Sequence, residues 1–120
     1  DIAIVCNRRK VLWLPGCGTL TEIAKPEELG CEIVKLFPAD IYGPEFIKAI
    51  KGPCPWTSIM PTGGVLPTVE SLTLWLDAGA VCVGLGSQLI SKEILDKNDF
   101  EGLKNKVSEV LAIIKKIKNK

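Results

Sequence analysis

Residues 33–39 read Ile-Val-Lys-Leu-Phe-Pro-Ala, in which a short apolar run (33–37) contains one lysine and is followed by a proline. Three further apolar runs, at residues 11–14, 58–60 and 81–85, are each followed by residues that break regular structure and then by a stretch with helical patterning. Runs that are apolar on both faces are typical of strands in a parallel sheet covered by helices. Four repeats of strand, turn and helix therefore predict a parallel α/β fold.

The composition is that of one globular domain, which we expect to span residues 1–120. The 120 residues are 47% hydrophobic and 24% charged with a formal net charge of +1, so no overall field attracts nucleic acid or a membrane surface. No apolar run approaches the roughly 18 residues of a membrane span. The absence of histidine excludes histidine-ligated metals and imidazole-activated nucleophiles. Five cysteines without C-x-x-C spacing predict free thiols in a reducing compartment, hence a cytoplasmic location, with an organelle stroma as the alternative.

Helix boundaries can be read at several points. Thr19 and Glu22 have the spacing of a capping box, Pro44 suits a first helical turn, and Gly79 suits a helix end. The last twenty residues predict an amphipathic helix with a solvent-exposed lysine face. Its apolar face is expected to comprise Leu103, Val107, Val110, Leu111, Ile114 and Ile117.

Two architectures use this repeat. An open doubly wound sheet fits the length, whereas a (β/α)8 barrel needs eight units and usually at least ~200 residues. Breaker-rich segments after every strand favour the barrel, because its ligand-binding groups follow many strands and do not gather at one switch point. No G-x-G-x-x-G or Walker-type motif marks a nucleotide fold. If the fold is a barrel, this chain forms half of it.

Lys35 is the first candidate for chemistry, because it lies near the carboxyl end of a strand that should be buried. A buried ammonium is costly unless it is paired or loses its proton, and a neutral lysine amine attacks ketones to form a Schiff base. The alternatives are a lysine on an edge strand or a structural salt bridge.

Glycine-rich turns are the second candidate. Gly63 and Gly64 follow one predicted strand, and Gly86 and Ser87 follow the next. Such turns let backbone amides approach an anion, and the last two units of barrels commonly hold a phosphate. Tight turns without a ligand are the alternative. For Asp40 and Tyr42, which follow the Lys35 strand, turn roles are predicted, with ligand contact as the alternative.

Four motifs occur in order along the chain: Pro-Gly-Cys-x-Thr-x-Thr-Glu at 15–22, Val-Lys-Leu-Phe-Pro-Ala at 34–39, Pro-Thr-Gly-Gly-Val at 61–65 and Val-Gly-x-Gly-Ser at 83–87. Together they resemble the 2-keto-3-deoxy-6-phosphogluconate aldolase family, which includes 4-hydroxy-2-oxoglutarate aldolases. The resemblance implies a (β/α)8 barrel of which residues 1–120 form the carboxyl-terminal half, comprising strands five to eight and the terminal helix. It also implies a homotrimer, or pairing with an amino-terminal half, and a class I aldolase (a lyase) that releases pyruvate and an aldehyde from a 2-keto acid.

Site residues follow from the same resemblance. Lys35 matches the Schiff-base lysine, Phe37 an aromatic residue lining the pocket, and Thr62 a substrate-contacting threonine. The phosphate-binding positions match Gly63, Gly64, Gly86 and Ser87. We expect no metal and no cofactor, and no nucleic-acid or membrane partner. The family's acid/base glutamate has no counterpart in this sequence, so the alternatives are a non-catalytic half-barrel that binds phospho-ligands and a fragment that mainly associates.

Overall fold

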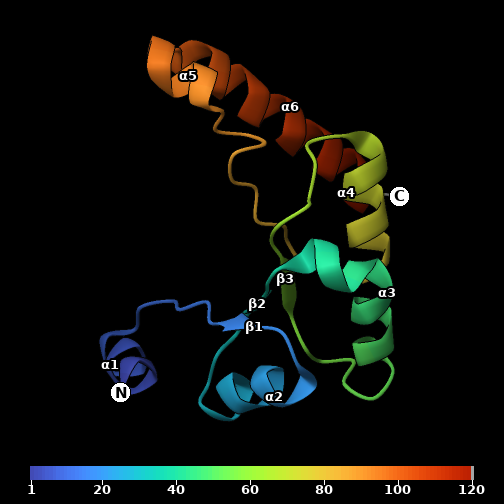
Figure 1. Cartoon of the computed structure of the whole chain (residues 1–120). Helices are drawn as coiled ribbons and strands as arrows, with labels where there is room; N and C mark the ends of the chain where they lie inside the picture. Colours follow the sequence, from blue (N-terminus) through green and yellow to red (C-terminus); the bar gives the residue numbers. More distant parts are fainter. Residues whose placement is uncertain (120) are drawn as a thin grey trace.

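A computed structural model describes residues 1–119 of the chain (Figure 1). Its sheet has three short parallel strands, β1 (Gly16–Cys17), β2 (Val34–Leu36) and β3 (Ile59–Pro61), with β2 in the centre. The helices of the described residues are α1 (Ile2–Arg9), α2 (Leu20–Glu28), α3 (Ala39–Lys51), α4 (Val69–Asp77), α5 (Lys92–Lys97) and α6 (Phe100–Lys118). The parallel α/β class predicted from the sequence is confirmed.

One face of the sheet is buried against helices. Val34 and Leu36 of β2 and Ile59 of β3 are almost fully buried, and they share one core cluster with side chains from α2, α3, α4 and α6. Lys35 and Met60, at the alternate positions, are half-buried and are register partners, so they share the other face. The sheet thus has one face covered by helices and one partly open face that carries Lys35.

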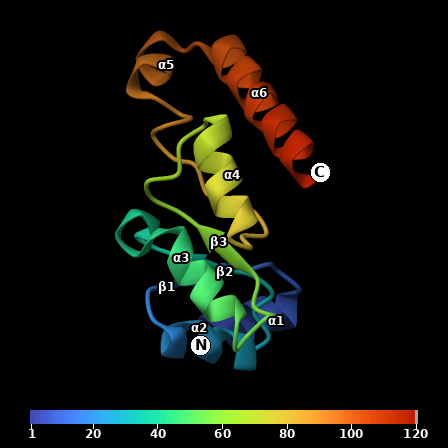
Figure 2. The same cartoon turned by 90° about the vertical axis from the view of Figure 1, so that its right-hand side faces the viewer.

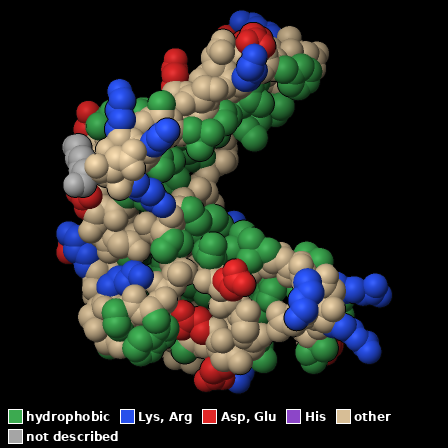
Figure 3. Space-filling view, turned by 180° about the vertical axis from the view of Figure 1, so that it is seen from behind, with side chains coloured by type: hydrophobic (Ala, Val, Ile, Leu, Met, Phe, Trp, Pro, Cys, Tyr) green, Lys and Arg blue, Asp and Glu red, His purple; other side chains and the backbone are tan. Residues whose placement is uncertain are grey.

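The chain curves around a hollow. Figure 2 shows α4 beside α6 at one end, with α1 and α2 near the other end of the molecule. The space-filling view in Figure 3 shows a C-shaped outline with hydrophobic side chains along the walls of the hollow. Several large apolar side chains are exposed to solvent, among them Leu12, Phe37 and Phe100.

Two of the four predicted strands differ from the structure. Residues 11–14 form no strand: Val11 and Leu12 are exposed, and the first strand begins only at Gly16. The reason is pairing, since the amide of Lys35 donates to the Pro15 carbonyl and the ladder with β2 starts there. Residues 81–85 run beside β3 but make a single bridge, Thr62 to Gly84. The sheet of the described residues therefore has three strands in place of the four expected.

The predicted helix signals are mostly confirmed. The Thr19–Glu22 capping box forms, and Gly79, at φ 104°, follows the end of α4. Pro44 begins the second part of α3, directly after a kink at Gly43 (φ 72°). Helices α1 and α5 were not predicted.

The terminal helix is confirmed as α6, with one correction to its apolar face. Val110 is buried at 5% exposure, but Leu111 is 60% exposed, so the prediction that Leu111 joins the buried face is wrong. The helix presents Ile113 to the core cluster in its place. No helix among residues 1–119 combines the length and the apolar character that a membrane crossing requires.

Candidate active site

Lys35 occupies the centre of the sheet. Its backbone lies between Gly16 of β1 and Met60 of β3, so the alternative of a lysine on an edge strand is wrong. Its ammonium lies 5.1 Å from the centroid of the Phe37 ring, within the range of a cation–π contact. Among residues 1–119, no carboxylate forms an ion pair with Lys35. The amine therefore stands on the open face beside an aromatic ring, without an acidic partner from this part of the chain.

Thr62 follows β3 on the same edge of the sheet. Its amide donates to the Leu36 carbonyl and its carbonyl accepts from the Ala39 amide, both at 2.9 Å, which fixes its backbone against β2. Its hydroxyl is buried and has no hydrogen-bond partner among the described residues. The missing side chain of Gly84 leaves the space that this hydroxyl fills. A buried hydroxyl without a partner costs about 1–3 kcal/mol, so a ligand that bonded it would remove that cost.

The two glycine turns lie at the same edge, because they follow the carboxyl ends of neighbouring parallel segments. Gly63 (φ 90°) and Gly64 (φ 72°) both have the left-handed backbone that favours glycine. A side chain on Gly63 would contact Phe37 and Asp40 at 3.5 Å, so this turn packs directly against the turn after β2. Gly86 and Ser87 are exposed, and the space around Gly86 is open. The structure thus brings Lys35, Phe37, Thr62 and both turns to one end of the sheet.

The turn after β1 is held by Glu22. Its Oε2 accepts from the amides of Gly18 and Thr19 at 2.9 and 3.0 Å and from the Thr19 hydroxyl at 3.2 Å. These hydrogen bonds, chiefly that from the Gly18 amide, lower the pKa of Glu22 below its ordinary value. Cys17 is buried beneath this turn and donates to the Glu22 carbonyl, and burial is the main cause of its raised pKa. Both groups therefore have structural roles, and for Glu22 the predicted capping role is confirmed.

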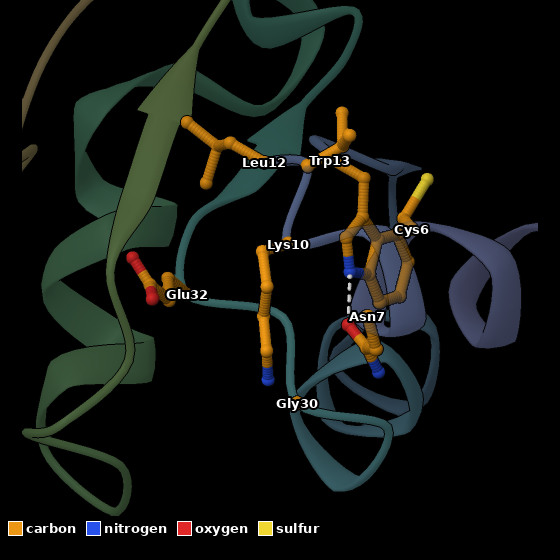
Figure 4. Close-up of a pocket in the computed structure, with 8 residues that line it drawn as sticks. Cys6, Asn7, Lys10, Leu12, Trp13, Gly30 and Glu32 are labelled. Atoms are coloured by element: carbon orange, nitrogen blue, oxygen red, sulfur yellow. Dashed lines mark hydrogen bonds between the residues drawn. The ribbon is translucent and has the colours of Figure 1, made fainter.

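A pocket of about 500 Å³ lies away from these residues and was not predicted (Figure 4). It is lined by Cys6, Asn7, Lys10, Val11, Leu12, Trp13, Gly30 and Glu32, which precede β1 and β2 or belong to α1. Two hydrogen bonds tie its wall together: the Trp13 indole donates to Asn7 at 3.1 Å, and Asn7 donates to the Leu29 carbonyl at 2.6 Å. No sequence motif marks these residues, because the pocket arises from the packing of α1 against the segment after α2.

Comparison with known proteins assigns a family. A family model described as KDPG and KHG aldolase matches residues 1–106. The chain belongs to this aldolase family. The 2-dehydro-3-deoxy-6-phosphogalactonate aldolase of Escherichia coli K12 is 43% identical over 76 residues, which are 62% of this chain and 36% of that protein. The 2-dehydro-3-deoxy-phosphogluconate aldolase of Haemophilus influenzae is 32% identical over 115 residues, 95% of this chain and 53% of that protein.

Solved structures agree with the aldolase family. A structure entitled "Native KDPGal structure" superposes with a TM-score of 0.83 at 27% identity, covering 99% of this chain and 55% of that one. A thiamine phosphate pyrophosphorylase from Pyrococcus furiosus has a TM-score of 0.72 at 15% identity and shares the fold alone. The chain spans about half the length, or less, of the curated relatives it matches.

Proposed function

We propose that this chain carries the Schiff-base centre of a class I aldolase, with Lys35 as the covalent residue. The substrate would be a 2-keto-3-deoxy-6-phospho sugar acid or 4-hydroxy-2-oxoglutarate, and the products pyruvate and an aldehyde. The position of Lys35 carries the proposal: it is the central amine of the sheet, without an ionic partner in residues 1–119, in a chain of this aldolase family.

In the proposed reaction, the neutral Lys35 Nζ attacks the C2 ketone, and loss of water gives an iminium. The C3–C4 bond then breaks as the C4 hydroxyl loses its proton, so that C4 leaves as an aldehyde and the electron pair enters an enamine. Protonation of the enamine at C3 and hydrolysis of the iminium release pyruvate and restore Lys35. Atoms and electrons balance without an external oxidant or reductant.

The neighbouring residues would bind the substrate. The Phe37 ring, 53% exposed, forms one wall beside the amine, and the buried hydroxyl of Thr62 offers a hydrogen bond. The turns at Gly63–Gly64 and Gly86–Ser87 would place backbone amides against the phosphate. Glu22 is not assigned the acid/base role, because its carboxylate already accepts three hydrogen bonds and holds the turn.

We further propose that residues 1–120 form one half of a (β/α)8 barrel. Three features support this: the open face of the sheet, the exposed apolar side chains, and the outer edge of β1, which pairs with no strand among residues 1–119. Closing a barrel covers such surfaces and removes the edges. The remaining units would come from the same polypeptide or from a second chain. A homotrimer, as the resemblance implies, and a cytoplasmic location, as the free thiols predict, belong to the same proposal.

Trapping tests the proposal. The complete protein is incubated with pyruvate and borohydride, and intact mass and peptide mapping locate any reduced adduct. We expect an adduct on Lys35, its loss in Lys35→Met, and its retention in Lys25→Met, which changes an exposed lysine paired with Glu28. If folded protein forms no adduct, the site is not a Schiff-base site. A phospho-ligand that still raised the melting temperature would then favour a binding module.

A further inference from the structure

Tyr42 lies where the turn after β2 meets the turn after β1, and the proposed reaction gives it no role. Its hydroxyl occupies the place that a side chain on Gly18 would take. A Cβ placed on Gly18 would also lie 3.6 Å from Glu22 Oε2. The Tyr42 ring packs against Phe46, with centroids 4.8 Å apart, which holds it in position. The nearby hydrogen bonds join Gly18, Thr19 and Glu22, and none among residues 1–119 involves the Tyr42 hydroxyl.

This hydroxyl lies at the same edge of the sheet as the candidate site residues. Gly16 is the register partner of Lys35, and the ladder continues one step further, from the Phe37 amide to the Cys17 carbonyl. Gly18 directly follows Cys17, the last residue of β1, so it lies at the carboxyl edge of the sheet. The Tyr42 hydroxyl, which lies against Gly18, therefore stands at the carboxyl edge of the sheet, where Phe37, Thr62 and the glycine turns also lie.

Glycine at position 18 makes room for the Tyr42 hydroxyl, whereas the backbone conformation at this position does not itself require glycine. Its φ lies outside the left-handed region, so other residues could adopt the same conformation. A larger side chain at position 18 would first contact the Tyr42 hydroxyl. Because that atom is the end of a side chain, alanine at position 18 should displace the hydroxyl and leave the turn in place.

The negative charge of Glu22 limits which substrate groups can bind beside Tyr42. Three hydrogen bonds stabilise the Glu22 carboxylate and lower its pKa, so it carries a negative charge at neutral pH. That charge repels a phosphate or a second carboxylate from this side of the site. A neutral hydroxyl is accepted, because a phenol both donates and accepts hydrogen bonds.

We propose, on the basis of the proposed function, that Tyr42 is a specificity-determining residue whose hydroxyl bonds a hydroxyl group of the substrate's phosphorylated fragment, beyond the cleaved bond. A 2-keto-3-deoxy-6-phospho sugar acid carries such a group at C5. The smaller substrate, 4-hydroxy-2-oxoglutarate, has a carboxylate at that carbon, which would face the charge of Glu22. Tyr42 therefore favours the phosphorylated sugar acid.

The test compares kcat/KM for the two substrates in the complete protein. We expect the ratio of kcat/KM, phospho sugar acid over 4-hydroxy-2-oxoglutarate, to fall about 3- to 10-fold in Tyr42→Phe, as the loss of one neutral hydrogen bond predicts. Gly18→Ala should lower the ratio similarly, because it displaces the hydroxyl. Gly52→Ala is the matched control: it lies at the far end of α3, where an added Cβ makes only ordinary contact at 3.5 Å, and the ratio should stay constant.

A ratio is insensitive to loss of folded protein, since both substrates are measured on the same sample. An unchanged ratio in Tyr42→Phe, or equal losses on both substrates, would overturn the assignment of Tyr42. Failure of the proposed function looks different: the unmutated protein would form no borohydride-trapped pyruvate adduct on Lys35, and the role of Tyr42 would be refuted with it.

Discussion

Gly64→Ala tests how tightly the turn after β3 packs on the start of α3. Gly64 has φ 72°, where a side chain costs roughly 1–2 kcal/mol. The added Cβ would also collide with the Asp40 Cβ and lie 3.1 Å from the Asp40 Cα. The Asp40 Cα is part of the α3 backbone, so relieving the contact requires the helix to shift. Such a shift typically costs a further ~1–3 kcal/mol. We expect the free energy of unfolding to fall by about 3 kcal/mol.

Two neighbouring substitutions separate these contributions. Gly63 has a similar backbone, φ 90°, but an added Cβ would have its nearest contacts at 3.5 Å, so Gly63→Ala should cost only about 1–2 kcal/mol. Gly52→Ala has neither a positive φ nor a close contact and should change stability by less than about 0.5 kcal/mol.

Urea unfolding of the complete protein, followed by circular dichroism, measures all three. Combining Gly64→Ala with Asp40→Gly, which removes the Cβ that is struck, should recover at least ~1 kcal/mol relative to the sum of the single changes. Equal costs for Gly63→Ala and Gly64→Ala, with no coupling to Asp40, would refute the packing described between these two turns.

Two further predictions concern Thr62 and Glu22. Thr62→Val replaces a buried hydroxyl that has no partner in residues 1–119 with a methyl group. It should therefore raise the free energy of unfolding by about 1 kcal/mol and slow formation of the pyruvate adduct. A loss of stability in urea would contradict this. Because hydrogen bonds lower the folded-state pKa of Glu22, its contribution to stability is complete above the ordinary glutamate pKa of about 4.3 and is lost as pH falls through the lower folded value. Glu22→Gln should therefore flatten the dependence of the melting temperature on pH below about 4.3, and an unchanged acid limb would contradict the assignment.

The local features of this fold were predictable from sequence because they depend on neighbouring residues. The capping box of Thr19 and Glu22 joins groups three residues apart, and the left-handed backbone at Gly79 is a property of the residue itself. Lys35 was recognisable as a candidate because a lysine inside an apolar run is costly unless the fold gives it a role. The turns at Gly63–Gly64 and Gly86–Ser87 were recognised for the same kind of reason, as breakers directly after apolar runs.

Segment pairing required the tertiary structure. Residues 11–14 are as apolar as the true strands, but no segment of the described chain pairs with them, and the ladder begins at Gly16 because its partner is Lys35. Likewise, Val110 and Leu111 are adjacent and equally apolar, yet only Val110 faces the core. Such outcomes depend on contacts between residues distant in sequence, which local patterning does not encode.

The parallel α/β class, several helix ends, and a lysine within a buried strand with glycine turns after the strands could be predicted from the residues alone, since propensity, capping and burial cost act over a few residues. The central position of β2, and the burial of the Thr62 hydroxyl without a hydrogen-bond partner among residues 1–119, became apparent only in the folded chain. The same is true of the position of the Tyr42 hydroxyl over Gly18. Each of these features depends on packing between segments separated by tens of residues, and local sequence preferences do not determine how such segments pack.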